Sequence, residues 1–572
     1  MQMRIFHCNF TQKFENCAMN NIPSFNALLQ KTIADNWDLD ALTDYKGATL
    51  QYHDVARKIE KIHILFENSG VTVGDKIALC GRNSSMWACA FLATLTYGAI
   101  AVPIQHEFTP DQVYNIVNHS ESKLLFVGDV VATSLDYEKM PQLEGVIYLP
   151  DLSLQVARTE KLTYAREHLN EIYGMRYPMY FRKEHLHYYA DKPEELCMIN
   201  YTSGTTGFSK GVMLPYRSIW SNIDFLTEAL GKKYEHPSNV LAILPMAHMY
   251  GLSCEFLMNI CMGNHIYFLT RLPSPTVIQQ AFADIHPSVV IAVPMVIEKI
   301  VRKKIFPMFN NQKVRLLMMM PGIGKKVKAH IHQQVMEVFG GHPYEILVGG
   351  APLNKEIEQF LRSVDVPITM VYGTTETGPV ITYSDWKDFR PGSCGTGVTH
   401  MEVKIDSPDP QNVSGELLTR GLNVMVGYYK NEQATKAVLD ADGWFHTGDL
   451  GTMDADGYIF LRGRSKNMLL GSNGQNVYPE EIEDKLNSMT MVNESLVIQQ
   501  GEKLIGLVHP DYDEANNLGF SNEDLANIME ENRKKLNTLL PPFCKLSEIK
   551  LQVDEFQKTP KKSIKRYLYQ NV

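Results

Sequence analysis

The chain has 572 residues, of which 44% are hydrophobic and 21% are charged. This composition is typical of a globular protein and excludes a disordered chain, a collagen-like fibre and a small disulfide-stapled domain. The 64 Asp and Glu residues outnumber the 55 Lys and Arg residues, and the resulting net charge of -9 gives no reason to expect a nucleic-acid partner. Length alone suggests about three or four domains.

Cysteine usage and the N-terminus both favour a cytoplasmic protein. The nine cysteines are an odd number, are widely spaced and contain no C-x-x-C pair, which predicts a reduced compartment and no cysteine metal site. They are Cys8, Cys17, Cys80, Cys89, Cys197, Cys254, Cys261, Cys394 and Cys544. Residues 1–21 form an N-terminal extension that lacks the continuous apolar core of a secretory signal.

Helical patterns alternate with short apolar runs from residue 22 to about residue 130. The helical patterns cover residues 25–33 and 52–68, and the apolar runs cover residues 76–80 and 123–127. This alternation predicts βαβ units around a parallel sheet.

One stretch, MWACAFLATLTYGAIAVPI at residues 86–104, has nearly the length and apolar character of a membrane span. Gly98 and Pro103 interrupt it, however, and no second such segment accompanies it. We therefore expect a buried helix that ends near Tyr97, a glycine turn and a short buried strand at residues 99–102.

Strand-like and helix-like segments alternate again between residues 240 and 371, which predicts a second sheet in the same large domain. The strand-like runs are 240–244, 289–293, 345–348 and 368–371, and the helix-like segments include 328–338 and 355–363. Residues 392–427 change to short alternating strands with frequent glycines, which suggests an all-β appendage. Past residue 463 a shorter α/β pattern continues to the C-terminus.

The most informative segment is LCMINYTSGTTGFSKGVML at residues 196–214, where a hydroxyl- and glycine-rich loop with one lysine separates two apolar runs. Gly204, Gly207 and Gly211 let backbone N–H groups approach a polyphosphate, the hydroxyls donate hydrogen bonds, and Lys210 adds a mobile positive charge. The lysine spacing excludes a Walker A loop. A flexible linker is the alternative, but linkers rarely lie between two apolar runs.

This loop, YTSGTTGFSKG, resembles the signature of the adenylate-forming superfamily, which contains acyl-CoA synthetases, firefly luciferases and peptide-synthetase adenylation domains. Ser209 stands where proline is commoner, and the resemblance extends from about residue 22 to residue 568. It implies an α/β fold in which residues 1–463 form a large N-terminal domain of two α/β sheet subdomains plus a small β subdomain, and residues 464–572 a small mobile α/β cap. It also implies ATP binding by Thr202, Ser203, Gly204, Thr205, Thr206, Gly207 and Lys210.

YGTTETGP, residues 372–379, follows an apolar run and places Glu376 in a hydroxyl-rich loop after a strand, where open α/β sheets bind their ligands. A hard oxygen ligand beside a phosphate loop suggests Mg²⁺. The resemblance implies that this glutamate holds Mg²⁺ and that Tyr372 packs on adenine. The neighbouring residues expected at ATP are Gly373, Thr374 and Thr375.

Two further segments resemble the parts of the family that meet the acyl group. One is VGGAPL, residues 348–353, whose backbone in the family contacts adenine on one side and the acyl group on the other. By resemblance, Gly350 and Ala351 are expected at adenine and Gly349 at the acyl group. PMAHMYG, residues 245–251, resembles the acyl-pocket motif with His248 facing the substrate. Spacing alone would make His248 a core histidine.

GWFHTGDLG, residues 443–451, carries Asp449, and an aspartate held in a tight turn is suited to accept both hydroxyls of a ribose, the role that the family assigns to it. The acidic pair at 454 and 456 is read as a hairpin turn. GRSKNMLLGSNGQNVYPEEIE, residues 463–483, is the expected domain junction. By resemblance Arg464 contacts ribose or phosphate, Lys466 is the hinge, and CoA binds near Gly471, Ser472, Asn473 and Gly474; Asn467 stands where aspartate is usual.

The C-terminal segment FQKTPKKSIKR, residues 556–566, departs from the family pattern. The position of the adenylation lysine is occupied by Ser563, and Lys562 stands where glycine is usual. We assign the role to Lys562, because a flexible four-carbon stem can absorb a shift of one residue whereas serine cannot replace a cation. Lys561 and Lys565 are the alternatives, and so is a solvated basic tail.

The resemblance implies that ATP activates a carboxylic acid to an acyl-adenylate, which is then transferred to CoA with release of AMP and pyrophosphate. Three segments, VPMVIEKI (293–300), FGGHPYEILVGGAPL (339–353) and LLGSNGQNVYPEEIE (469–483), look most like the long-chain fatty acid:CoA ligase branch. We therefore expect a medium- to long-chain fatty acid substrate, ATP, Mg²⁺ and CoA, and transient contact with the inner face of a membrane. The oligomeric state stays open.

Two alternatives remain at this point. Within the enzyme class, the protein could load an acyl carrier protein or activate an aryl acid. In a different class, Ser563 at the lysine position suggests a non-catalytic protein that binds a nucleotide or an acyl group.

Overall fold

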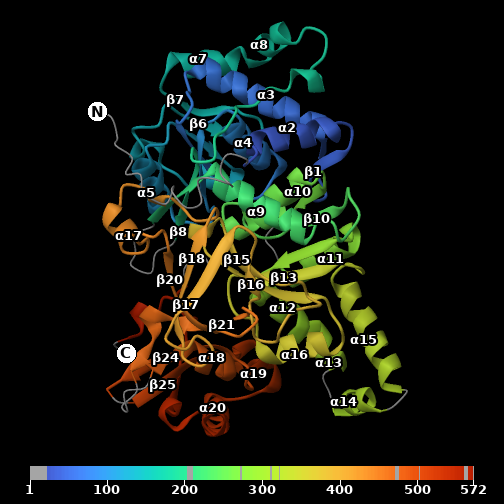
Figure 1. The fold of residues 1–572 in the computed structure, drawn as a ribbon, viewed down its shortest axis with the longest axis vertical. Helices are drawn as coiled ribbons and strands as arrows, with labels where there is room; N and C mark the ends of the chain where they lie inside the picture. Colours follow the sequence, from blue (N-terminus) through green and yellow to red (C-terminus); the bar gives the residue numbers. More distant parts are fainter. Residues whose placement is uncertain are drawn as a thin grey trace.

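The structure, a computed structural model, describes residues 22–202, 210–270, 274–309, 312–320, 323–470, 476–501, 503–558 and 564–570. Figure 1 shows the first large sheet toward one end of the long axis, the second large sheet and a four-stranded sheet next to each other in the middle, and a C-terminal α/β unit at the other end. The expected α/β architecture with a large N-terminal part and a small C-terminal part is confirmed.

The first sheet has eight strands in the order β19-β9-β8-β4-β3-β5-β6-β7. Its strands are β3 (Lys76–Cys80), β4 (Ile100–Ile104), β5 (Leu124–Val127), β6 (Gly145–Tyr148), β7 (Leu154–Ala157), β8 (Leu196–Thr202), β9 (Lys210–Pro215) and β19 (Gly427–Tyr428). Five of them, β8, β4, β3, β5 and β6, run parallel, as βαβ units require. Its helices include α3 (Tyr52–Ser69), α4 (Ser85–Thr96), α5 (Pro110–Ser120), α6 (Asp129–Ala132), α7 (Glu160–Glu167) and α8 (Leu169–Arg176).

The apolar stretch of residues 86–104 is α4 followed by β4, as the sequence predicts. Ser84 caps the helix by accepting a hydrogen bond from the N–H of Trp87, and Gly98 turns the chain at φ +81°. Nearly every residue of α4 is buried, so its uniform apolar character serves the protein core. Across the described ranges, we find no helix with the length and hydropathy that crossing a bilayer requires.

The second sheet has nine strands in the order β16-β15-β14-β13-β12-β10-β11-β1-β2. They are β1 (Asp40–Asp44), β2 (Thr49–Gln51), β10 (Asn239–Ala242), β11 (His265–Phe268), β12 (Val289–Ala292), β13 (Glu345–Gly349), β14 (Ile368–Gly373), β15 (Val380–Tyr383) and β16 (Thr396–Gly397). The hairpin β1–β2 precedes the first sheet in the chain but pairs with β11 here. The sequence analysis missed this crossover because the hairpin is short and half polar.

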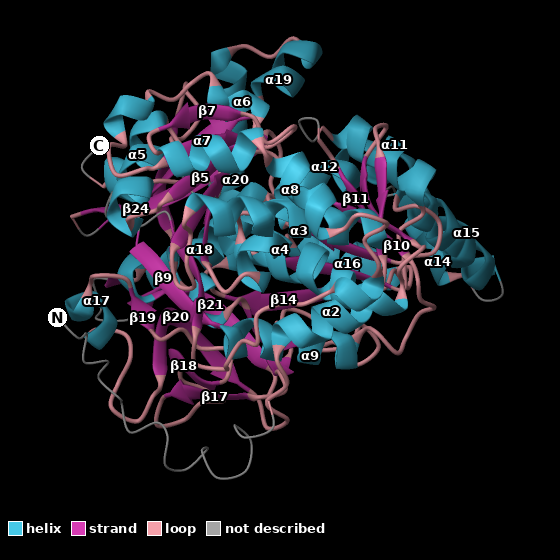
Figure 2. Ribbon diagram, turned by 90° about the horizontal axis from the view of Figure 1, so that it is seen from above, coloured by secondary structure: helices cyan, strands magenta, loops and turns pink. Residues whose placement is uncertain are grey.

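Helices from both halves of the N-terminal part pack on these two sheets (Figures 1 and 2). They are α2 (Phe25–Asp35), α9 (Tyr216–Ala229), α10 (Met258–Cys261), α11 (Pro275–Ile285), α12 (Pro294–Ile300), α13 (Phe306–Phe309), α14 (Gln312–Met319), α15 (Ile323–Val338) and α16 (Lys355–Ser363). The amphipathic helix α9 buries its apolar side and supplies buried polar groups to the neighbouring loops.

The predicted β appendage exists, but its boundaries differ from those expected. The four-stranded sheet consists of β17 (Met401–Asp406), β18 (Gly415–Gly421), β20 (Phe445–Met453) and β21 (Ile459–Arg464), and therefore extends well past residue 427. At residue 427 itself the chain leaves this sheet, because β19 pairs with β9 of the first sheet. The pair β20–β21 is the hairpin that the acidic turn at 454–456 predicts.

The C-terminal unit has a hydrophobic core of its own, which includes Ile482, Leu486, Leu525 and Leu536. It contains β24 (Val492–Gln500), β25 (Lys503–Pro510) and β26 (Leu546–Leu551), with helices α18 (Pro479–Asn487), α19 (Tyr512–Leu518) and α20 (Asn522–Leu539). The short pair β22 (Leu469–Leu470) and β23 (Asn476–Val477) precedes it, and α17 (Glu432–Lys436) lies beside β19.

Candidate functional site

The predicted phosphate loop connects the antiparallel strands β8 and β9. Thr202 and Lys210 are cross-strand partners at the end of this hairpin, so the two strands bring both ends of the loop together. Gly211 lies within β9, and a Cβ there would be 2.9 Å from Ile199 Cγ2 and 3.0 Å from Tyr201 Cζ. Side-chain packing therefore requires this glycine. Ser203, Gly204, Thr205, Thr206 and Gly207 lie outside the described residues.

Lys210 and Glu376, which are far apart in the sequence, meet through Tyr428. The Lys210 ammonium lies 4.6 Å from the centroid of the Tyr428 ring, in the range of a cation–π contact. The Tyr428 hydroxyl donates a 2.9 Å hydrogen bond to Glu376 Oε1. Tyr428 thus connects the hairpin of the phosphate loop to Glu376, the expected Mg²⁺ ligand. It is a site residue that the sequence analysis missed.

The loop that carries Glu376 is held by buried side chains. Asn222 on α9 donates to the carbonyl of Thr377 at 3.1 Å and accepts from the N–H of Val380 at 2.9 Å. Ser253 donates to the carbonyl of Gly378 at 3.0 Å. The other predicted residues of this loop, Gly373, Thr374 and Thr375, lie at the end of β14 and at the start of a single 3-10 turn. The loop is therefore prepositioned by the fold.

Asp449 lies in the middle of β20, so the predicted tight turn is wrong. The strand carries an irregularity here: Gly448 has φ +74°, and the register with β21 shifts just after Asp449. Because Asp449 and Arg464 are direct cross-strand partners, Arg464 Nε reaches Asp449 Oδ1 at 3.1 Å. The Tyr372 hydroxyl donates to Asp449 Oδ2 at 2.6 Å, and these three predicted residues come together as one group.

The electrostatics of this group are set by burial and by the ion pair. Burial raises the pKa of Asp449, while the charge of Arg464 and the hydrogen bond from Tyr372 act in the opposite direction. The Asp449 carboxylate in turn raises the pKa of Arg464. A buried aspartate with a charged partner and a neighbouring aromatic ring is an arrangement suited to a nucleoside.

The VGGAPL segment leaves β13 beside Tyr250, as predicted for a place of close approach. A Cβ on Gly349 would lie 3.0 Å from Tyr250 Cζ and 3.1 Å from the carbonyl oxygen of Val371. Gly350 adopts φ +89°, a conformation that side chains disfavour. Ala351 follows and is exposed. The two glycines are therefore needed for backbone geometry between β13 and β14.

The segment around His248 is anchored by two asparagines that the sequence analysis missed. Asn83 donates to the carbonyl of Leu244 at 2.7 Å and accepts from the N–H of Met246 at 2.8 Å. Asn200 on β8 donates to the carbonyl of Ala247 at 3.1 Å. His248 itself is half-buried. Asn83 lies between β3 and α4 and Asn200 lies on β8, so this part of the chain, which follows β10 of the second sheet, is held by residues of the first.

Glu255 is a further residue that the sequence analysis missed. Its side chain is fully buried, and its two oxygens accept hydrogen bonds from the N–H groups of Ile243 at 3.1 Å and Leu244 at 3.0 Å. Burial raises its pKa well above the usual value for a glutamate. The sequence signal was available, because Glu255 is the one acidic residue in the apolar run GLSCEFLMNI.

The expected hinge lies where the four-stranded sheet meets the C-terminal unit. Lys466 is on a single turn, Ser465–Asn467, and Asn467 donates to Glu480 Oε1 at 2.6 Å. The buried Glu483 accepts from Arg566 Nη1 at 2.9 Å, which fixes the C-terminal tail to α18. The predicted CoA residues Gly471, Ser472, Asn473 and Gly474, and the predicted lysine Lys562 with Lys561 and Ser563, lie outside the described residues.

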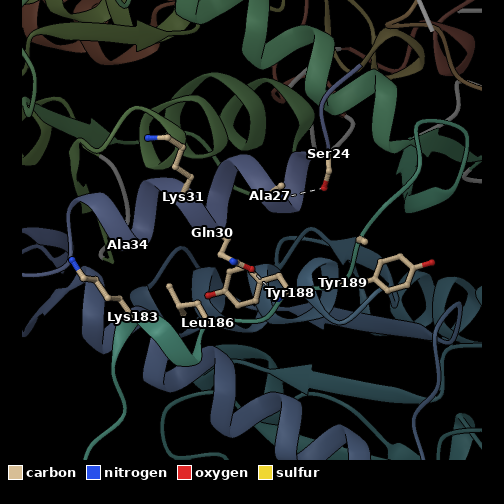
Figure 3. Close-up of a pocket in the computed structure, with 10 residues that line it drawn as sticks. Ser24, Ala27, Gln30, Lys31, Ala34, Lys183, Leu186, Tyr188 and Tyr189 are labelled. Carbon is tan, nitrogen blue, oxygen red and sulfur yellow. Dashed lines mark hydrogen bonds between the residues drawn. The ribbon is translucent and has the colours of Figure 1, made fainter. Parts of the chain in front are cut away.

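A separate surface hollow lies on α2 and contains none of the predicted site residues (Figure 3). It is lined by Ala27, Gln30, Lys31, Leu186 and Tyr188, among others. Its polar groups serve the fold: Ser24 caps α2 by accepting from the N–H of Ala27, and Gln30 accepts from the N–H of Tyr188. We assign no functional role to this hollow.

Comparisons with known proteins agree with this geometry. Residues 29–429 match the family described as AMP-binding enzyme, and residues 466–571 match the AMP-binding enzyme C-terminal domain. Long-chain-fatty-acid–CoA ligase ACSBG2 of Gallus gallus is 26% identical over 464 residues, which are 76% of this chain and 59% of that protein. 4-coumarate–CoA ligase CCL1 of Humulus lupulus is also 26% identical, over 81% of this chain and 79% of that protein.

Solved structures share the fold. The crystal structure of ATP-bound MatB from Rhodopseudomonas palustris superimposes with a TM-score of 0.72 at 21% identity, covering 96% of this chain and 98% of that one. At this identity the likeness establishes the architecture, including the order of the large and small parts.

Proposed function

Because the chain belongs to the AMP-binding enzyme family, we propose that it is an AMP-forming acyl-CoA ligase that activates a medium- to long-chain fatty acid. The observation that carries the proposal is the assembly of Lys210, Tyr428 and Glu376 beside the hairpin of the phosphate loop. The group of Tyr372, Asp449 and Arg464 supports it, since Asp449 receives a hydrogen bond from Tyr372 and pairs with Arg464.

In the first step, a carboxylate oxygen of the acid forms a bond to the α-phosphorus of ATP. The bond between that phosphorus and the oxygen bridging to the β-phosphate breaks, and pyrophosphate leaves with the electron pair. Carboxylate and triphosphate repel each other, so the protein contributes mainly orientation and fixed positive charge. We assign this charge to Lys210 and, from the C-terminal unit, to Lys562.

Glu376 fits a Mg²⁺ ligand. It is a half-buried carboxylate, and a single carboxylate suffices because Mg²⁺ is usually bound through one or two carboxylates together with substrate phosphates. Among the described residues no cluster of three or more His, Cys, Asp or Glu side chains forms a self-sufficient metal site. When bound, the ion would neutralise polyphosphate charge, while the hydrogen bond from Tyr428 orients the carboxylate.

We assign the nucleoside to the group around Asp449. Tyr372 supplies a flat ring for adenine, and Asp449 supplies acceptors for the ribose hydroxyls. Gly350 and Ala351 approach from the end of β13. Because Tyr372 and Arg464 hold the carboxylate in place, its position is already defined before a nucleotide arrives.

In the second step, the sulfur of CoA forms a bond to the acyl carbonyl carbon and the thiol proton is lost. The bond between that carbon and the phosphate oxygen of AMP breaks, and AMP leaves with the electron pair. We propose that residues 464–572 form a cap that reorients about Lys466 between the steps and brings Gly471, Ser472, Asn473 and Gly474 to CoA. The boundary is supported by the end of β21 at Arg464 and by the separate core of the C-terminal unit.

The fatty-acid assignment is supported by two segments that resemble long-chain ligases. Glu298 of VPMVIEKI accepts a 2.9 Å hydrogen bond from the N–H of Asn354, which follows VGGAPL directly. This hydrogen bond therefore joins the two segments, one of which contains Gly349. The equal identity of the chain to a fatty-acid ligase and to a coumarate ligase makes an aryl acid the competing substrate.

A screen of acid-dependent pyrophosphate release tests the proposal. The purified chain is incubated with ATP, Mg²⁺, CoA and single acids from C2 to C20, together with coumarate and benzoate. We expect release to peak with a medium- or long-chain acid and to be matched by AMP. Turnover with aryl acids alone, or with an acyl carrier protein instead of CoA, would change the substrate assignment. ATP binding without pyrophosphate from any acid would identify a non-catalytic binder.

A further inference from the structure

The segment between Glu298 and Glu337 has a composition unlike the rest of the chain. It contains nine Lys and Arg residues and no Asp or Glu, whereas the whole chain carries a net charge of -9. In the structure this segment supplies α13, α14 and α15, and the last two form a hairpin that projects from the body of the molecule (Figures 1 and 2). Positive charge is thus concentrated on this stretch of the chain, partly on the hairpin and partly on the helical run that precedes it.

Helix α14 carries apolar side chains that pack inward and others that are exposed. Val314 and Met318 face inward and pack against the core of the second sheet. Leu316 and Met319, by contrast, are 66% and 82% exposed. The fold therefore buries part of the apolar surface of this helix and leaves Leu316 and Met319 exposed, which is unusual for large apolar side chains that lie close together.

The exposed apolar side chains continue from this helix onto its neighbours. We define the hairpin patch as Met308, Leu316, Leu317, Met319, Met320 and Ile323, together with the exposed basic residues Arg302, Lys303, Lys304, Lys325 and Lys326. The two helices are pressed together, since a Cβ on Gly324 would lie 2.3 Å from the carbonyl oxygen of Met318. Apart from Met308, which lies on α13, the apolar residues therefore lie on the hairpin, and basic residues stand before and after them in the chain.

We propose that the hairpin patch docks on the surface of an anionic lipid bilayer. Exposed Leu, Met and Ile side chains can enter the boundary between headgroups and acyl chains, and Lys and Arg pair with anionic headgroups. Docking of this kind places an element on a membrane without crossing it. A second copy of the chain is a poorer occupant, because a symmetric interface would bring two strongly positive elements together.

The path of the chain connects the hairpin patch to the acyl side of the candidate site. Val293 lies beside Gly350, with its Cγ1 3.7 Å from the position of a Cβ there, and α12 begins at the next residue. The helical run from Pro294 to Phe309 then leads directly to the hairpin. The chain path thus joins the hairpin to the part of the protein that we assign to the acyl group. The docking itself does not depend on that assignment.

Vesicle flotation tests the proposal with two independent variants. We expect the wild-type chain to float with vesicles of phosphatidylcholine containing 30% phosphatidylglycerol, and to be released by 0.5 M NaCl. The double variants Leu316→Ser/Met319→Ser and Lys325→Gln/Lys326→Gln are each expected to bind about tenfold less. The matched controls are Met175→Ser/Met179→Ser and Lys534→Gln/Lys535→Gln, which alter exposed residues elsewhere and are expected to bind like wild type.

Three results would overturn the proposal: no binding of wild type to the anionic vesicles, equal binding by the hairpin variants, or a wild-type dimer in solution that the Leu316→Ser/Met319→Ser variant lacks. Pyrophosphate release with a short, soluble acid is measured on the same preparations. The hairpin variants are expected to keep that activity, which shows that they fold. Loss of flotation and failure of the proposed reaction are thereby separate outcomes.

Discussion

Two glutamates lie at opposite ends of the central strands of the second sheet, and they differ in their burial. At the amino end of β13, Glu345 is fully buried, and it accepts hydrogen bonds from the Tyr383 hydroxyl at 2.7 Å and from the N–H of Trp386 at 2.9 Å. At the carboxyl end of β14, Glu376 is half-buried and accepts from Tyr428. In the sequence, Glu345 opens the apolar run EILV, whereas Glu376 stands in the hydroxyl-rich loop YGTTETGP.

The difference shows how the fold separates a structural acid from a functional one. Burial raises the pKa of Glu345 to about 8, and protein donors satisfy both of its oxygens. Glu376 stays partly in solvent, and its surrounding loop is fixed by Asn222 and Ser253. The carboxyl end of a parallel sheet is also where loops converge on ligands. The buried Glu345 cannot reach a ligand in solvent, whereas the half-buried Glu376 can. This difference is the physical reason for assigning the metal-binding role to Glu376.

The largest expected effect comes from removing the charge at the open end. Glu376→Gln is expected to lower pyrophosphate release by at least about 100-fold, since it removes a fixed charge that acts on the polyphosphate. Release is measured at saturating acid over a range of Mg²⁺ concentrations. The matched control is Glu345→Gln, which makes the same change at the closed end and is expected to leave turnover unchanged. Equal losses in both variants would remove the distinction between the two ends.

The C-terminal lysine is expected to affect one half-reaction only. Lys562→Ala should slow adenylate formation by about 100-fold, because the transition state loses a cation, and should leave the reaction of a supplied acyl-adenylate with CoA unaltered. Pyrophosphate release and thioester formation are followed separately. Unchanged pyrophosphate release, with a loss in Lys561→Ala or Lys565→Ala instead, would transfer the role to that lysine.

The hydroxyl of Tyr428 is expected to have a smaller effect. Tyr428→Phe removes the hydrogen bond to Glu376 and keeps the ring beneath Lys210, so we expect about a tenfold loss of turnover. The measurement is turnover as a function of Mg²⁺ concentration, in which the variant needs more Mg²⁺ for half its maximal rate. Tyr429→Phe, which removes a neighbouring hydroxyl bonded to Glu121, is the control. If both variants resemble wild type, the hydroxyl does not orient Glu376.

The smallest effect on activity, and a distinct effect on stability, is expected at Glu345. In the folded chain the Glu345 carboxyl keeps its proton up to about pH 8, whereas a glutamate in the unfolded chain loses its proton near pH 4.3. Stability from the protonated form is therefore complete below about pH 4 and is lost as pH rises to 8. The glutamine in Glu345→Gln stays neutral, so the Tm of this variant should rise relative to that of wild type as the pH increases from 5 to 8. A Tm difference that is constant over this range would contradict the raised pKa.

The sequence predicts the elements of the fold well where one pattern is continuous. The run 86–104 was recognised as helix, turn and strand because Gly98 and Pro103 interrupt an otherwise apolar stretch. The pairing of β1 with β11 was missed, because strand partners far apart in the chain leave no local signal. The end of the β appendage was also missed, because the segment GWFHTGDLG was interpreted as a tight turn around Asp449 where the chain forms β20.

The candidate site was predicted wherever chemistry depends on residue type. Lys210, Tyr372, Glu376, Asp449 and Arg464 were all identified from motifs, and the structure brings them into two groups. The residues that join or hold them were missed. Tyr428, Asn83, Asn200 and Asn222 belong to no motif, and their roles follow from which strands and helices become neighbours.

The central claim is that the substrate acid attacks the α-phosphate of ATP, and oxygen transfer tests it most directly. An acid labelled with ¹⁸O in its carboxylate is turned over with ATP, Mg²⁺ and CoA, and the products are separated by mass spectrometry. The account predicts one ¹⁸O atom in the phosphate of AMP for each thioester formed, with unlabelled pyrophosphate. Unlabelled AMP, or label in inorganic phosphate together with ADP, would contradict it.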